Sequence, residues 1–258
     1  MKKYIFSIIT IIVLLPAFTF SQSLFGATDK TIGNLILPYS AAGSGRSYEI
    51  ASLDTVEVNP QNFSLWTKLA NTTYTVDAGY EGATAKDNDK NSYYSELFNF
   101  QGGYLGIPLK KKMLVLGIGL QPISNIDRRF IDTLKTETAE TNNLYLKGGL
   151  GRGIINISYS PVESFGIGIG YEYTFGTIKE NFVIEYEDVS YYRIGIKKES
   201  RFSGHGAVIS GFIRPANNLT VGMFGRLPVN TRVDIERNSS SDFLNKSQKA
   251  DITLPAQY

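Results

Sequence analysis

Cysteine is missing from this 258-residue chain, and histidine occurs only once, at position 205. The absence of cysteine excludes disulfides, thiolate metal sites, a cysteine nucleophile and a lipid anchor on an N-terminal cysteine. A single histidine also excludes the usual histidine-rich metal sites. Basic and acidic side chains nearly balance, at 26 against 24, so the chain lacks the positive excess that binding to a phosphate backbone needs.

Glycine and aromatic residues are abundant, with 25 glycines, 16 tyrosines and 15 phenylalanines against one tryptophan. Aromatic side chains suit pleated surfaces, and glycine punctuates strands and turns. Beyond Phe20, no stretch approaches the roughly 20 apolar residues that a membrane-spanning helix needs. The composition therefore predicts an all-β chain.

The first residues have the pattern of a secretory signal. Lys2 and Lys3 precede an apolar run over residues 4–20, which ends in small and polar residues. Thr19 and Ser21 satisfy the small-residue preference for a cut after Ser21. We predict that residues 1–21 are a signal peptide, with an uncleaved membrane anchor as the alternative.

Residues 22–70 differ from the rest of the chain, because short mixed segments are broken at Pro38, Gly43, Gly45 and Pro60. We interpret this region as an irregular hatch or plug. From residue 71 onward, apolar positions alternate with small or polar ones, which is the period of a sheet with two different faces. We therefore predict a β-domain over residues 71–258.

The clearest alternation runs from Phe165 to Gly176, where Phe, Ile and Tyr occupy the odd positions and Gly, Glu and Thr the even ones. A soluble sandwich and a membrane barrel both produce such faces. In the sandwich the apolar face meets another sheet, whereas in the barrel it meets lipid.

The connections favour a membrane barrel, because short turns alternate with long polar loops, as in outer-membrane barrels with short periplasmic turns. The expected short turns are Pro108–Lys112, Pro161–Ser164 and Pro215–Asn218. The expected long loops are Gly82–Ser92, Pro122–Asn143, Thr177–Ser200 and Val229–Ala250. The seven expected strands are Asn71–Glu81, Tyr93–Ile107, Met113–Gln121, Leu144–Ser160, Phe165–Gly176, Arg201–Arg214 and Leu219–Leu227. We expect the fifth and sixth strands to extend beyond the bilayer into residues 177–200.

An eighth strand begins in the tail, where apolar residues alternate between Asp251 and Tyr258. These eight residues contain Pro255 and are shorter than the roughly 9 to 11 that a spanning strand needs. Either this short strand closes a small barrel, or the chain is the first half of a larger one. We favour the second alternative.

Four segments, in this order along the chain, carry a resemblance to a known family: Gly43–Arg46, Val58–Asn62, Gly117–Ser124 and Phe165–Gly176. They resemble the FadL-type outer-membrane transporters of long-chain fatty acids and other hydrocarbons. The resemblance implies a 14-stranded transmembrane antiparallel β-barrel, about half of which is present, with an N-terminal hatch. It also implies hatch or gating roles for four residues: Gly43, Gly45, Asn59 and Pro60. Gln61 departs from the alanine usual after Asn-Pro in that family.

The function implied by the resemblance is passive, hatch-gated passage of long-chain fatty acids or other hydrophobic compounds through the barrel. The glycine-rich inner face of residues 165–176 either leaves space for a pocket or fits close packing of the hatch. Arg46 and Arg152 are candidates for binding a carboxylate headgroup, and the alternative for Arg152 is an ion pair with Glu172. We expect a monomer in the outer membrane of a Gram-negative-type bacterium, in contact with outer-membrane lipid.

Two other functions stay open. A barrel of this kind can act without transport, as a docking or shuttle protein for secretion machinery. A barrel hydrolase would use Ser203 and His205 together, but a catalytic triad is defined by a geometry that adjacency in sequence does not supply. We therefore predict no enzymatic activity, no metal, no cofactor and no nucleic-acid partner.

Overall fold

The structure is a computed structural model, and it describes seven parts of the chain: residues 34–36, 58–86, 92–134, 140–186, 194–216, 219–239 and 246–254. All of them belong to the second of two units, which covers residues 32–258. The expected signal peptide, together with Gly43, Gly45 and Arg46, lies outside the described residues.

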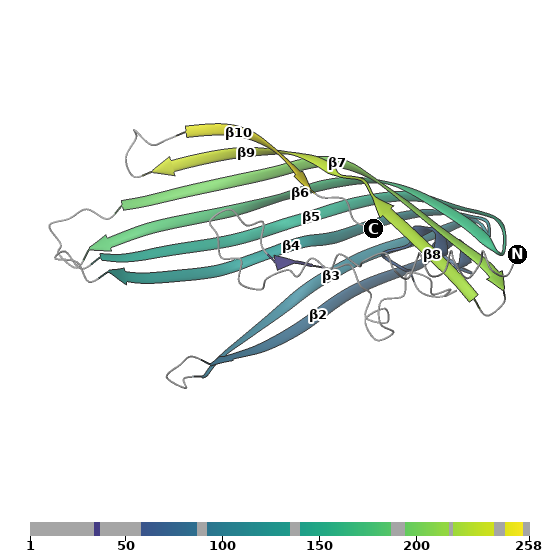
Figure 1. The fold of residues 1–258 in the computed structure, drawn as a ribbon, viewed down its shortest axis with the longest axis horizontal. Coiled ribbons are helices and arrows are strands. Elements are labelled where there is room, and N and C mark those ends of the chain that lie inside the picture. The colour runs from purple at the N-terminus through teal and green to yellow at the C-terminus, as the bar shows by residue number, and fades with distance from the viewer. Residues whose placement is uncertain are drawn as a thin grey trace, which may run out of the picture. The chain divides into compact units, whose positions relative to one another are not determined.

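The strands form one antiparallel sheet (Figure 1). Their bounds are β1 Asn34–Leu35, β2 Thr73–Lys86, β3 Ser92–Lys110, β4 Leu114–Leu134, β5 Glu140–Val162, β6 Phe165–Tyr186, β7 Ile194–Ala216, β8 Leu219–Arg226, β9 Val229–Ser239 and β10 Lys246–Leu254. The hydrogen-bonded order is β10-β9-β7-β6-β5-β4-β3-β2, with β1 added to β4 and β8 to β7. The all-β, antiparallel prediction is confirmed, and no ladder joins the end strands β2 and β10 within the described segments.

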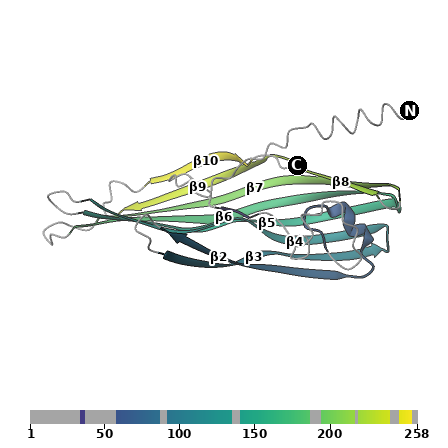
Figure 2. The same ribbon diagram turned by 60° about the horizontal axis from the view of Figure 1, so that its bottom comes forward.

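The helical content of the described residues is one short 3-10 helix, η1, at Phe63–Lys68. Figure 2 shows η1 against one face of the sheet, and its contacts fall on β4, β5, β6 and β7. None of the described helical segments has the length and apolarity that crossing a membrane requires.

The two faces of the sheet differ as the alternation predicts. In β6, every odd-numbered side chain from Phe165 to Phe175 is exposed and every even-numbered residue between them is buried. In β5, Ile155 and Ile157 are exposed while the residues next to them are buried. We call the exposed apolar side the outer face and the side that carries η1 the inner face.

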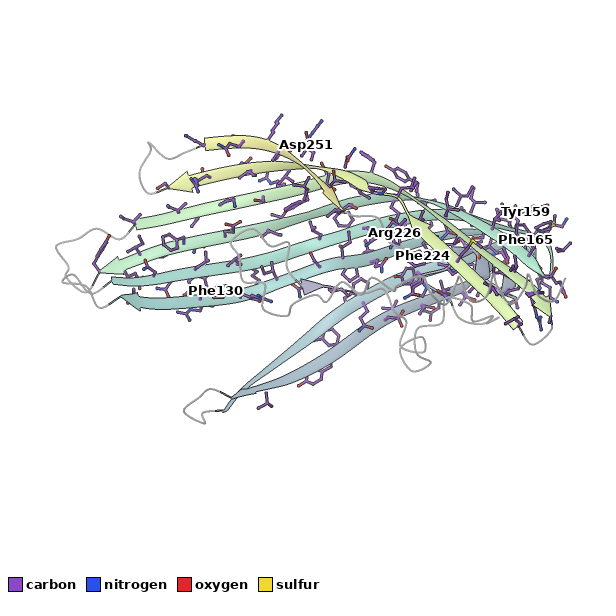
Figure 3. All side chains as sticks on the ribbon, viewed as in Figure 1. Phe130, Tyr159, Phe165, Phe224, Arg226 and Asp251 are labelled. Carbon is purple, nitrogen blue, oxygen red and sulfur yellow. The ribbon has the colours of Figure 1, made fainter. Side chains whose placement is uncertain are left out.

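The apolar part of the outer face has the height of a bilayer core. Ten steps of about 3.3 Å from Phe165 to Phe175, along a strand tilted by about 40°, rise about 25 Å. Aromatic rings lie at both ends of this span, with Tyr159 and Phe165 at the end of the β5–β6 turn (Figure 3) and Tyr173 and Phe175 at the other. Such aromatic girdles mark the two interfaces of outer-membrane barrels.

Several strands run well past this span, which corrects the expected loop at residues 122–143. The ladder between β4 and β5 continues to the pair Leu134 and Glu140. The apolar alternation ends near Gln121 because polar residues replace apolar ones on the outer face beyond the apolar span, while backbone pairing persists. The expected extensions of the fifth and sixth strands are present, since β6 runs to Tyr186 and β7 begins at Ile194.

The expected loop at residues 229–250 is also wrong, because it contains β9 and most of β10. β8 and β9 pair one after the other with the same neighbour, β7, and are interrupted at Leu227 and Pro228. Proline has no backbone N–H, so it cannot donate to the ladder and separates the two halves of one long strand. From the sequence alone, Pro228 cannot be distinguished from the end of a strand, which explains the wrong prediction.

Two glycines in neighbouring strands allow a close backbone approach just beyond the apolar span. Gly148 in β5 and Gly176 in β6 have φ angles of 136° and 159°, which L side chains rarely adopt. A Cβ at Gly148 would also collide with the carbonyl oxygen of Thr177 in β6. Only glycine fits this position without displacing the neighbouring strand.

We predict that Gly148→Ala lowers the free energy of unfolding by about 1–3 kcal/mol, because the methyl group adds backbone strain and a collision with β6. The measurement is urea-induced unfolding of the purified protein in detergent micelles. Gly153→Ala in the same strand is the matched control, since a Cβ there meets nothing within 4 Å. An equal loss in both variants would rule out this explanation.

Candidate functional site

The residues before η1 fold into a turn built on Asn59. Its Oδ1 accepts the backbone N–H groups of Gln61 and Asn62, at 2.9 and 3.0 Å, which is the turn chemistry expected of asparagine before proline. Pro60 is buried. Asn62 then caps η1 by accepting the N–H of Ser64 at 3.1 Å. We call residues 58–70 the hatch segment.

The hatch segment is hydrogen-bonded to two strands of the inner face. The Asn62 side-chain amide donates to the carbonyl of Gly211 at 3.1 Å, and Ser210 Oγ in the same strand, β7, accepts the N–H of Ser64 at 3.0 Å. In β5, Ser158 Oγ donates to the carbonyl of Phe63 at 2.7 Å. The last two bonds satisfy backbone groups of η1, the N–H of Ser64 and the carbonyl of Phe63.

Large apolar side chains of the hatch segment fill the space against the wall. Phe63, Trp66 and Leu69 are each at most 1% exposed and share a cluster with wall residues from four strands. Phe63 and Tyr104 each meet Trp66 edge to face, with ring centroids 5.5 and 6.3 Å away. The Trp66 indole N–H donates to the carbonyl of Asn59 at 2.6 Å, which ties the helix to its own turn.

The glycines on the inner face of β6 make room for this packing. A Cβ at Gly168 would lie 2.9 Å from the Ser64 nitrogen and 3.1 Å from the Phe63 carbonyl carbon. At Gly170 it would lie 3.3 Å from the Phe63 ring. Of the two interpretations of this glycine-rich face, the structure shows close packing of the hatch.

Further along the inner face lies a buried group of three charges from three strands. Glu172 in β6 accepts two hydrogen bonds from Arg226 Nε, at 2.8 and 2.9 Å, and one from Arg152 Nη1 at 3.4 Å. The three side chains are between 1% and 6% exposed. We call them the charge triad, and their formal charge is positive because two guanidinium groups share one carboxylate.

Polar atoms without partners accompany the charge triad. Gln121 in β4 is paired with Arg152 in the ladder and is 1% exposed. Neither of its two amide atoms, nor Arg152 Nε, nor the Tyr104 hydroxyl has a hydrogen-bond partner in the described structure. Leaving buried polar groups unpaired costs free energy, so such groups often mark places where water or a ligand binds.

The structure separates the other candidate residues from this site. His205 is exposed on the outer face of β7, where its Nδ1 meets the Tyr171 hydroxyl and its ring lies 5.2 Å from that of Tyr173. Alternation places Ser203 on the same outer face, whereas Glu172 lies on the inner face. Among the described residues, no cluster of three His, Asp or Glu side chains is arranged to hold a metal ion.

Sequence reasoning found Arg152 and Glu172 but missed Arg226. The Arg152–Glu172 ion pair considered as an alternative is present, and the binding of a carboxylate by Arg152 stays a prediction. The alternation of β8 could have identified Arg226. Its even-numbered positions, Thr220 to Arg226, are on the inner face, where Glu172 also lies. The contact partners of the hatch were not predictable, because they lie 95 to 149 residues away in sequence.

Comparisons with known proteins agree with this fold. The family model described as BamG matches residues 9–253. The chain is similar to the crystal structure of a Pseudomonas aeruginosa FadL homologue, with a TM-score of 0.54 and 11% sequence identity over 87% of this chain. It spans 64% of the length of that homologue, and at this identity the likeness concerns the fold alone. No curated protein matches the sequence.

We predict that Glu172→Gln lowers the free energy of unfolding by about 3–5 kcal/mol, because it removes the buried carboxylate charge that Arg152 and Arg226 both contact. Urea unfolding in detergent micelles measures the loss. Glu180→Gln in the same strand is the control: its bond to Lys198 is shorter, 2.7 Å, but more exposed, so the loss is at most about 1 kcal/mol.

A triple variant tests whether charge is the cause. Replacing all three members together, as Arg152→Met, Glu172→Leu and Arg226→Met, removes the uncompensated charge and restores stability to near that of the wild type. A triple variant as unstable as Glu172→Gln would show that packing, and not charge, explains the loss.

We further predict that Gly168→Val displaces the hatch segment from the wall and lowers the free energy of unfolding by about 1–3 kcal/mol. Trp66 is the one tryptophan of the chain, so its fluorescence reports on the hatch, with red-shifted emission and stronger quenching by acrylamide expected. Gly225→Val is the control, because a Cβ there meets nothing within 4 Å. Unchanged Trp66 quenching in Gly168→Val would contradict the packing argument.

Proposed function

The chain belongs to the BamG family, and we propose that it is an outer-membrane β-barrel protein that works without transport, as a docking partner for secretion or envelope-assembly components. The outer-membrane location is supported by the barrel-like sheet, its apolar span of about 25 Å and the FadL-homologue fold. A Gram-negative-type cell envelope follows from that location.

The bonding of the hatch segment to the wall is the observation that carries this proposal. η1 is held by side-chain hydrogen bonds to β5 and β7, and its large apolar residues are almost completely buried. Lys68 adds a bond to the carbonyl of Glu163 in the β5–β6 turn, at 2.8 Å. Opening a passage here requires breaking all of these contacts at once, which favours a permanent plug over a gate.

Passive transport of fatty acids or other hydrophobic compounds is the second candidate, and the charge triad favours it. Arg152 Nε and the side-chain amide of Gln121 are buried and have no hydrogen-bond partner in the described structure. A ligand carboxylate would satisfy such donors. In this alternative the hatch segment shifts during passage, and Arg152 contacts the headgroup.

A disulfide between hatch and wall distinguishes the two functions. Ser64 and Ser210 are hydrogen-bonded neighbours, and the natural chain has no cysteine, so Ser64→Cys with Ser210→Cys introduces one defined bond under oxidising conditions. A docking protein keeps full complementation of a deletion strain and retains its co-purifying envelope proteins when locked.

A transporter behaves differently in the same experiment. Locking would reduce uptake of labelled fatty acid by at least tenfold, and a reductant would restore it. Each single-cysteine variant serves as the control for effects of substitution. Reversible loss of uptake on locking, with uptake also absent in the deletion strain, would overturn the docking proposal.

A further inference from the structure

The end of the sheet that carries the short turns is strongly basic. The β3–β4 turn contains Lys110, Lys111 and Lys112, which are all exposed. Lys68 ends η1 nearby, and Arg214 lies near the end of β7. The one acidic residue among the described residues of these turns is Glu163, so positive charge exceeds negative at this end.

Two of these cations contact the same residue, Glu163. Lys112 Nζ lies 3.3 Å from Glu163 Oε1, and Lys68 Nζ donates to the backbone carbonyl of the same residue. Burial lowers the pKa of Lys68, and repulsion from Arg214 and Lys112 lowers it further, against the attraction of Glu163. Lys110 and Lys111 are exposed in the same turn as Lys112.

An apolar groove of about 630 Å³ opens on the outer face beside the basic turn. Its lining comes from β5, β6 and β7 and includes Ile155, Ile157, Tyr159, Ile167, Ile169 and Ala207. The hollow forms because Ala207, opposite Tyr171 in the ladder, is much smaller than the isoleucines and tyrosines around it.

The groove and the basic turn adjoin one another. Tyr159, at one end of the groove, pairs with Leu114, which is two residues after Lys112. The N–H of Ser160 also donates to the carbonyl of Met113 at 2.8 Å. A molecule with an apolar tail in the groove therefore has its other end within reach of the lysines.

We propose that this surface is a binding site for an anionic phospholipid of the periplasmic leaflet, with an acyl chain in the groove and its phosphate at Lys110 and Lys111. The site rests on the outer-membrane location proposed above. An acyl chain matches the apolar lining within the membrane-facing span, and the phosphate complements the excess of positive charge.

At the opposite end of the sheet, two of the exposed cations contact carboxylates: Lys179 lies 3.8 Å from Glu199, and Arg201 lies 2.9 and 3.5 Å from Glu199 and Glu236. The basic turn lies at the end with the short turns, which is periplasmic in outer-membrane barrels. This location assigns the phosphate to a phospholipid of the periplasmic leaflet. Lipid A also carries phosphate, so the test compares the two lipids.

Lipid retention by the full chain tests the site. The protein is reconstituted in vesicles of phosphatidylcholine with phosphatidylglycerol or with lipid A, extracted in mild detergent, and weighed with its bound lipid by native mass spectrometry. We expect retention of phosphatidylglycerol, reduced about tenfold or more by Lys110→Gln with Lys111→Gln. Lys246→Gln with Lys249→Gln, exposed in β10, is the matched control and should retain the lipid.

A second pair of variants tests the groove. Ala207→Phe fills the hollow and should also abolish retention, whereas Val221→Phe, on the outer face of β8 away from the groove, should not. Retention of phosphatidylcholine or lipid A as strong as that of phosphatidylglycerol, or equal loss in test and control variants, would overturn the proposal. Failure of the wild type to insert into any vesicle would instead refute the outer-membrane location.

Discussion

The backbone of a helix can come into contact with a β-strand only where the strand carries no side chains that hold it away. The inner face of β6 meets that condition, since Gly168 and Gly170 bring the backbone of η1 within contact of the strand. Contact at this distance lets Ser158, Ser210 and Gly211 bond the hatch segment directly. The burial of Trp66 and Phe63 depends on the same spacing.

The charge triad on the inner face is constrained by the cost of burying charge. Glu172 alone would be a buried carboxylate with a large desolvation cost, and Arg226 and Arg152 offset that cost from two other strands. Because each partner comes from a different strand, the triad also fixes which residues of β5, β6 and β8 face one another. A slip of one residue in any of these strands would turn the charge of that strand toward the outer face.

Much of the fold was predictable from local alternation, and the errors have a physical cause. The period of two residues located the strands wherever the outer face is apolar, as from Phe165 to Phe175. The alternation did not locate the strand from Gln121 to Leu134, because backbone pairing continues there without an apolar face. It also failed across Pro228, where the proline lacks the N–H that would continue the ladder. The turn at Asn59 and the pair of Arg152 with Glu172 were within reach of sequence. The contact between hatch and wall was not, because it joins segments far apart in the chain.

The hatch segment precedes every strand it binds, and its partners in β7 are 146 and 149 residues further on. Contacts over such distances form late, because the entropy of closing a long loop must be overcome first. The hatch segment therefore packs on the wall only after β5, β6 and β7 have paired, so burial of Trp66 reports that this part of the sheet has assembled.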